Sequence, residues 1–273
     1  MKKNRIRIWV WTVLLLGVIL LCGCRAQDSA KEADNRNKII VGVDKFEPYT
    51  YLDINGNFTG VDIDLATLIF HKLGYEPEFQ IIPWSEKNKY LADGMIDCIW
   101  SCYSMNDREE DYQWAGPYLY SRQVIAVRTE SDMNTFSDLA EKEIGVQATT
   151  RAAELFLHKI PSDLPKVKQV NCFATTEDLF ASIRKGYVDA VSGHEALINE
   201  LIGSGEGAFR LLEESPHISK VGVAFQKGTH AELADAIDQL IREMSEDGTI
   251  GRIAEKYGLD AEKVVVGGET DEK

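Results

Sequence analysis

Short apolar runs alternate with amphipathic segments over residues 38–257 of the 273-residue chain. The runs are bounded by Gly, Pro, Asp and Asn and fit buried strands. The predicted strands are 38–43, 78–82, 96–100, 124–127, 144–146, 167–170, 187–191 and 221–225. The predicted helices are 62–74, 84–92, 175–185, 195–202, 230–246 and 248–257. Strands that alternate with helices predict an α/β fold with mostly parallel sheets.

The segment Gly60-Val-Asp-Ile-Asp-Leu-Ala is typical of a helix start. Asp62 is the expected N-cap, because a carboxylate there accepts hydrogen bonds from the first free backbone amides. Gly74 is the expected C-terminal stop. Before this helix, Asn55-Gly56 predicts a tight hairpin turn.

The run at 96–100 is followed at once by polar residues that suit a binding site. Three small residues come first: Ser101, Cys102 and Ser104. They leave hydroxyl and main-chain groups open at the carboxyl end of a strand, which is where ligands bind in open α/β sheets. Arg108 can reach back over them and offer a carboxylate two parallel hydrogen bonds. The alternative is a surface arginine that pairs with Glu109 or Asp111.

The composition is strongly acidic, with a formal net charge of −14. The first 23 residues hold four cations and no acid, so the remainder has 26 basic and 44 acidic side chains, a net charge of −18. Such a chain without a basic stripe is a poor candidate for binding nucleic acid or anionic lipid surfaces.

The N-terminus has the layout of a secretory signal. A basic segment precedes an apolar stretch of about 14 residues, from Ile8 to Leu21, which is short for a membrane span. Leu21-Cys22-Gly23-Cys24 resembles the lipobox of bacterial lipoproteins, which predicts a signal peptide at 1–23 and lipid attachment at Cys24. An ordinary signal or an uncleaved anchor is the alternative. Residues 24–37 are polar and aperiodic, as expected of a flexible tether.

Three further cysteines are Cys98, Cys102 and Cys172. Cys98 and Cys102 are four residues apart on or near one strand, so their Cα atoms would lie about 13 Å apart, beyond disulfide reach. We expect both to be free and buried. The sequence contains no Cys-x-x-Cys or His-rich spacing, and we expect no metal site and no cofactor.

Motifs in fixed order over residues 38–259 carry a family resemblance. They include Val-Gly-Val-Asp, Gly-Val-Asp-Ile-Asp-Leu-Ala, Gly-Pro-Tyr, Ile-Gly-Val-Gln-Ala-Thr-Thr, Tyr-Val-Asp-Ala-Val, Gly-Val-Ala-Phe-Gln-Lys-Gly and Glu-Asp-Gly-Thr-Ile-Gly-Arg-Ile-Ala-Glu-Lys-Tyr. In this order they resemble the extracytoplasmic solute-binding proteins of family 3, the polar amino-acid receptors of ABC importers.

The resemblance implies a two-lobed periplasmic-binding-protein type II fold, in which two crossing strands form the hinge. The expected organisation is lobe one at 38–121, lobe two at 122–218, and a return to lobe one with an acidic tail at 219–273.

The resemblance also implies the site residues. Arg108 corresponds to the carboxylate clamp, with Ser104 and the main chain of Ser101 and Cys102 beside it. Thr149 and Thr150 would grip the same carboxylate from lobe two, at a helix start whose free amides favour an anion. Phe46 and Trp84 would wall the ligand side chain.

Some positions depart from the family pattern. Cys102 and Ala148 stand where Gly is common, and the spacing from Ser104 to Arg108 is one residue shorter than usual. His194 stands where an Asp normally accepts the ligand's ammonium, and Glu195 follows it. Because histidine titrates near pH 6.5, we expect ligand affinity to change between pH 7.5 and 5.5 if His194 meets the ligand.

The expected function is a lipid-anchored, extracytoplasmic, monomeric receptor that passes an amino acid or related small carboxylate to an ABC permease. A sensory domain or adaptor is one alternative. A dehydratase-like enzyme on the same fold is another, but Gly203-Ser204-Gly205 lacks the first glycine of a nucleophile elbow and His194-Glu195 lacks the second histidine of a zinc motif. We therefore do not expect an enzyme.

Overall fold

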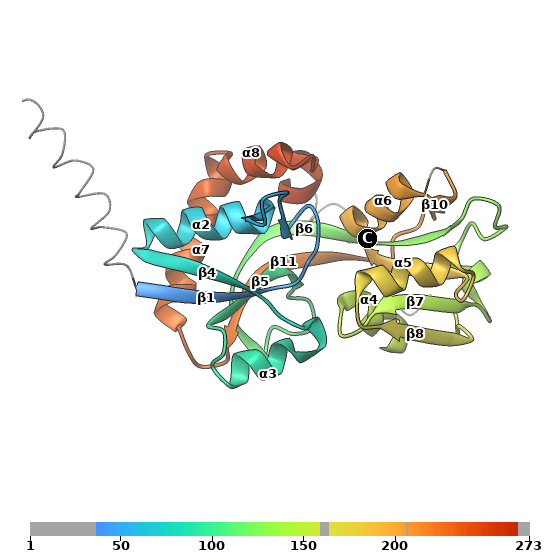
Figure 1. Ribbon diagram of the computed structural model, residues 1–273, viewed down its shortest axis with the longest axis horizontal. Helices are drawn as coiled ribbons and strands as arrows, with labels where there is room; N and C mark the ends of the chain where they lie inside the picture. The colour runs from blue at the N-terminus through green and yellow to red at the C-terminus, as the bar shows by residue number, and fades with distance from the viewer. Residues whose placement is uncertain (1–36, 159–163, 206, 267–273) are drawn as a thin grey trace, which may run out of the picture.

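The computed structural model describes residues 37–158, 164–205 and 207–266 as two α/β lobes side by side, joined by two long strands (Figure 1). The strands are β1 (Asn37–Val43), β2 (Tyr51–Leu52), β3 (Phe58–Thr59), β4 (Tyr75–Ile81), β5 (Cys98–Ser104), β6 (Tyr112–Arg128), β7 (Glu143–Gln147), β8 (Gln169–Phe173), β9 (Ala190–His194), β10 (Phe209–Leu211) and β11 (His217–Gln226).

The α-helices are α2 (Val61–Lys72), α3 (Lys87–Ala92), α4 (Arg151–His158), α5 (Thr176–Arg184), α6 (Glu195–Ser204), α7 (Ala231–Glu246) and α8 (Thr249–Lys256). Short helical turns are η1 (Trp84–Glu86), η2 (Phe136–Leu139) and η3 (Glu262–Val266). Among the described residues, no helix is long and apolar enough to cross a membrane.

The strands form a continuous mixed sheet in the order β4-β1-β5-β11-β6-β9-β7-β8, with β10 beside β6. The pairs at the two ends, β4-β1-β5 and β9-β7-β8, are parallel. The central β6 and β11 are antiparallel to each other and run between the lobes. The two lobes are therefore joined through the backbone of two strands, as the family resemblance implies.

Each lobe has its own apolar core. In lobe one, α2, α7 and α8 pack on one face of the sheet and α3 on the other. In lobe two, α4 packs with β7 on one face, while α5 and α6 cover the other. Buried side chains such as Trp100 in lobe one and Leu155 in lobe two are fully enclosed. Separate cores allow the lobes to move as bodies about β6 and β11.

Most predicted elements form, but some bounds and roles differ. The strand predicted at 167–170 is found at Gln169–Phe173. The backbone amides of Lys168 and Gln169 donate to the carbonyl oxygen of Lys142, and the pairing with β7 begins at Gln169. Asp62 is not an N-cap. Gly60 has that position, and Asp62 lies within the first turn of α2 with no exposed surface. The hairpin turn at Asn55-Gly56 joins β2 and β3 as predicted.

Several predictions fall outside the described residues, namely the signal peptide at 1–23, Cys24, most of the tether and the end of the acidic tail. Asn37, placed at the end of the tether, instead begins β1 and pairs with Tyr75. The lobe limits at 121/122 and 218/219 stay predictions.

Candidate functional site

A small cavity lies between the lobes, at the ends of strands from both. Asp44 and Phe46 follow β1, Arg108 follows β5, Gln147 ends β7 and His194 ends β9. The cavity is lined by Asp44, Phe46, Trp84, Ser101, Cys102, Tyr103, Ser104, Arg108, Gln147, Thr150, Arg151 and His194. Its volume is about 30 Å³, room for about two water molecules. The lobes must part before an amino acid can enter.

Arg108 is the best-placed anion receptor in this cavity. Its side chain is 7% exposed, and its guanidinium lies 4.8 Å from the centre of the Tyr103 ring. Nη1 donates a hydrogen bond to the carbonyl oxygen of Ser104 at 3.1 Å. Nε and Nη2 both donate to one carboxylate oxygen of Glu154 on α4, with the Nε contact at 3.0 Å. Arg108 therefore pairs across the lobes, and the alternative pairing with Glu109 or Asp111 is wrong.

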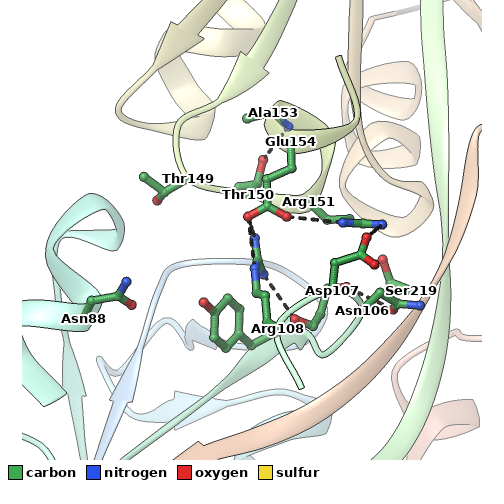
Figure 2. Close-up of polar contacts among 12 residues, drawn as sticks. Asn88, Asn106, Asp107, Arg108, Thr149, Thr150, Arg151, Ala153, Glu154 and Ser219 are labelled. Atoms are coloured by element: carbon green, nitrogen blue, oxygen red, sulfur yellow. Dashed lines mark hydrogen bonds and ion pairs between the residues drawn. The ribbon is translucent and has the colours of Figure 1, made fainter. Parts of the chain in front are cut away.

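Further polar contacts join the lobes around the cavity. Asp107 accepts a hydrogen bond from Arg151 at 2.6 Å. Gln147 donates to the Asp44 carboxylate at 2.8 Å. Figure 2 shows two of the contacts between the lobes, that of Arg108 with Glu154 and that of Arg151 with Asp107.

Lys87 adds a buried cation to the same interface. Its ammonium donates to the carbonyl and hydroxyl oxygens of Thr149, at 3.1 and 2.9 Å, and lies 4.8 Å from the centre of the Trp84 ring. Burial, together with the nearby charge of Arg108, lowers the pKa of Lys87 to about 7. Lys87 therefore titrates close to neutral pH.

Asp44 is the carboxylate that lines the lobe-one side of the cavity. Burial raises its pKa, and the hydrogen bond from Gln147 acts in the opposite direction. Its backbone amide donates to the hydroxyl of Ser101 at 3.0 Å, which ties the ends of β1 and β5 together. Asp44 can accept a hydrogen bond from a ligand cation if Gln147 moves away with lobe two.

His194 is held by the hinge strands rather than left free for a ligand. Nδ1 lies 2.9 Å from the hydroxyl of Ser121 on β6, and Gln123 is within 3.2 Å of both ring nitrogens. Gln123 also donates to Ser219 on β11 at 2.9 Å. Burial, with the charge of Arg108, lowers the pKa of His194 to about 3. A pKa this low predicts a neutral imidazole from pH 7.5 to 5.5 and argues against a titration of His194 in that interval, while the expected change of ligand affinity stays a prediction.

The main chain around Cys102 is less open than the sequence suggests. The amide of Cys102 donates to the buried carboxylate of Asp62 at 2.7 Å, and its thiol lies 3.9 Å from His194 Nδ1. Cys102 has φ of +46° and Thr149 has φ of +59°, which is the left-handed region that favours glycine. This conformation explains why glycine suits position 102. Cys98 and Cys102 are free and buried as predicted, and Cys172 is free and exposed.

Aromatic side chains form part of the walls of the cavity between the lobes. Trp84 meets Tyr103 edge to face at 5.4 Å between ring centres, and Phe46 lies 5.7 Å from the His194 ring. Both Phe46 and Trp84 line the cavity. Such flat walls suit the apolar stem of a small ligand.

The structure gathers eight of the nine predicted binding residues at the cavity: Phe46, Trp84, Ser101, Cys102, Ser104, Arg108, Thr150 and His194. Thr149 instead faces Lys87. Glu195, the alternative acid, pairs with Arg122 at 3.3 Å. Residues that the sequence did not single out are Asp44, Lys87, Tyr103, Gln147, Arg151 and Glu154. The described residues contain no group of three or more side chains that could hold a metal ion.

The cavity between two α/β lobes, with a buried arginine in its lining, is the kind of place where proteins bind small ligands. The chain belongs to the bacterial extracellular solute-binding proteins, family 3, whose model matches residues 39–260. Proteins of this family lie outside the cytoplasm, and the chain is a solute receptor of this kind.

The relatives are amino-acid-binding proteins. The L-cystine-binding protein TcyA of Bacillus subtilis is 25% identical over 96% of this chain and 100% of its own. An ancestral arginine-binding protein bound to arginine has a TM-score of 0.72 and 29% identity, covering 82% of this chain and 99% of that one. The ancestral amino-acid-binding protein AncCDT-1, a precursor of cyclohexadienyl dehydratase, has a TM-score of 0.71 and 25% identity over 84% of this chain and 99% of that one.

Proposed function

We propose that this protein is a lipid-anchored, extracytoplasmic receptor that binds an amino acid or a related small carboxylate between its lobes and delivers it to an ABC importer. The observation that carries the proposal is the buried fork of Arg108, which faces lobe two beside Ser104 and the aromatic walls. A guanidinium in this setting binds a carboxylate with two charge-assisted hydrogen bonds.

The proposed ligand pose places the carboxylate on Arg108, with Ser104 from lobe one and Thr150 from lobe two nearby. A cationic group of the ligand faces Asp44, because His194 is neutral and offers no negative charge. The stem lies between Phe46 and Trp84. L-cystine and L-arginine, the ligands in the names of two similar proteins, both have an α-carboxylate and a cationic group.

Closure is proposed to couple binding to transport. The lobes at 38–121 with 219–273, and at 122–218, would rotate about β6 and β11 until residues of both touch the same ligand. The closed receptor would then dock on a permease. A lipid at Cys24 and a tether would hold a monomer near that permease at the membrane surface.

The test is a thermal-shift screen of the chain from residue 25 onward against the common L-amino acids, L-cystine, keto acids and short peptides. A ligand that binds the native state raises Tm, by mass action. The proposal expects at least one amino acid or small carboxylate to raise Tm in a concentration-dependent way. If only cationic compounds without a carboxylate raise Tm, the assignment of Arg108 as the receptor of a ligand carboxylate is wrong.

A further inference from the structure

The carboxylate of Glu154 occupies the Nε–Nη2 edge of Arg108, which is one of the two edges that can bind a ligand carboxylate through two hydrogen bonds. Arg108 uses Nε and Nη2, the two nitrogens of one edge of its guanidinium, to bond Glu154. The remaining nitrogen, Nη1, donates to the Ser104 carbonyl. Three of the five N–H groups are therefore engaged, and a second carboxylate can form two parallel hydrogen bonds with the Nε–Nη2 edge only if Glu154 leaves it.

Glu154 has a second arginine to move to. Its other carboxylate oxygen lies 3.4 Å from Nη1 of Arg151, one turn earlier on α4. The side chain of Arg151 is 2% exposed, and its Nε is buried with no hydrogen-bond partner among the described residues. In Figure 2 the Glu154 carboxylate lies between the two arginines, with dashed lines to both.

We propose that Glu154 is an internal competitor of the ligand, which occupies Arg108 in the ligand-free closed protein and moves to Arg151 when a ligand carboxylate arrives. This inference rests on the proposed function. Glu154 then helps to set the affinity for carboxylates without contacting the ligand itself. It also joins lobe two to lobe one when no ligand is present.

The first consequence concerns the ligand-free protein. Loss of the Glu154 charge leaves Arg108 buried and unpaired in the closed arrangement, which favours opening of the lobes. Glu154→Gln keeps the shape of the side chain and removes only the charge. The matched control is Glu143→Gln, which removes a charge from another lobe-two ion pair, that with Lys168 at 2.8 Å.

Small-angle X-ray scattering without ligand compares the two variants with wild type. The inference expects a larger radius of gyration for Glu154→Gln and an unchanged one for Glu143→Gln. Equal radii for all three proteins would show that Glu154 does not hold the lobes closed, and that part of the inference would be withdrawn.

The second consequence concerns affinity. Calorimetric titrations use amino acids paired with their decarboxylated amines: L-arginine with agmatine, L-histidine with histamine, and L-cystine with cystamine. Glu154→Gln should bind the amino acid that wild type binds more tightly, on the order of tenfold for one part-buried charge contact. The matching amine should gain clearly less, because it does not compete for Arg108.

An unchanged or weaker affinity of Glu154→Gln for the amino acid would contradict the proposal that Glu154 competes with the ligand. It would indicate instead that Glu154 orients Arg108 or binds the ligand directly. An equal gain for the amino acid and its amine would overturn it too, because the effect would then be general opening. If wild type binds none of these probes, the proposed function loses its support, while the scattering comparison still decides the role of Glu154.

Discussion

The carboxylate of Asp62 on α2 accepts a hydrogen bond from the backbone amide of Cys102 at 2.7 Å, inside lobe one. Its other oxygen accepts one from the hydroxyl of Tyr118 on β6, also at 2.7 Å. Asp62 has no exposed surface, and burial raises its pKa to about 7. The carboxylate thereby fixes the left-handed backbone of Cys102, where β5 leads towards Ser104 and Arg108.

This buried carboxyl predicts a pH dependence of stability. The folded pKa of about 7 lies above the unfolded value of about 3.9, so the native state holds a proton that the unfolded state releases between these values. The contribution of Asp62 to the free energy of unfolding should therefore fall as pH rises from about 4 to 7. The total loss should be a few kcal/mol, since each pKa unit corresponds to about 1.4 kcal/mol.

Asp62→Asn keeps the shape and the acceptor for the Cys102 amide but does not titrate. Urea unfolding of wild type and Asp62→Asn at pH 4.5 and 7.5 should show that wild type loses stability relative to the variant at the higher pH. A difference between the two proteins that is the same at both pH values would mean that Asp62 ionises normally.

His194 should remain neutral under ordinary conditions. With a pKa of about 3, its imidazole should show no titration by NMR from pH 7.5 to 5.5. Since an unfolded histidine takes up a proton near pH 6.5, this residue should reduce the free energy of unfolding as pH falls below about 6.5. The His194→Gln variant identifies the resonance.

The same variant tests the role of His194 in binding. The pH profiles of ligand affinity for wild type and His194→Gln should have the same shape between pH 5.5 and 7.5. A His194 resonance with a midpoint near 6.5, or profiles that diverge over this interval, would show that the imidazole ionises in the folded protein.

Cys24 should be the site of lipid attachment. Cys24→Ala should give an unlipidated protein, either released or retained as an uncleaved precursor, because no thiol remains at the predicted cleavage point. Metabolic labelling with a fatty acid measures this, and Cys22→Ala is the matched control that should keep the label. Label on Cys24→Ala, or its loss from Cys22→Ala, would place the lipid elsewhere.

The strands and the polar edge of the cavity could be predicted from the sequence because the patterns that mark them are local. Apolar runs mark β1, β5 and β11, and small residues beside an arginine mark the end of β5. Asp62 was misassigned because an acid after Gly60 has the pattern of a helix cap. That pattern does not show that β6 would enclose the carboxylate and supply Tyr118 as a partner.

Glu154, the partner of Arg108, could not be predicted from such a local pattern. Glu154 lies 46 residues later on an amphipathic helix of the other lobe, where an acid in the first turn is ordinary. Only the arrangement of the two lobes against each other brings the two side chains together. Likewise, the pattern at His194 shows an unusual residue type. It does not show the contacts with Ser121 and Gln123, nor the burial and the nearby charge of Arg108 that lower the pKa of the imidazole.

The central claim is that Arg108 binds the carboxylate of a ligand held between the lobes. Calorimetry of wild type, Arg108→Gln and the control Arg122→Gln, an arginine outside the cavity that pairs with Glu195, tests it with the amino acid selected by thermal shift. Circular dichroism confirms that each variant is folded.

Loss of the buried contact should weaken binding by roughly 3–5 kcal/mol, a factor of about 10² to 10⁴, while Arg122→Gln stays within about threefold of wild type. A folded Arg108→Gln variant that binds the amino acid as wild type does would contradict the account.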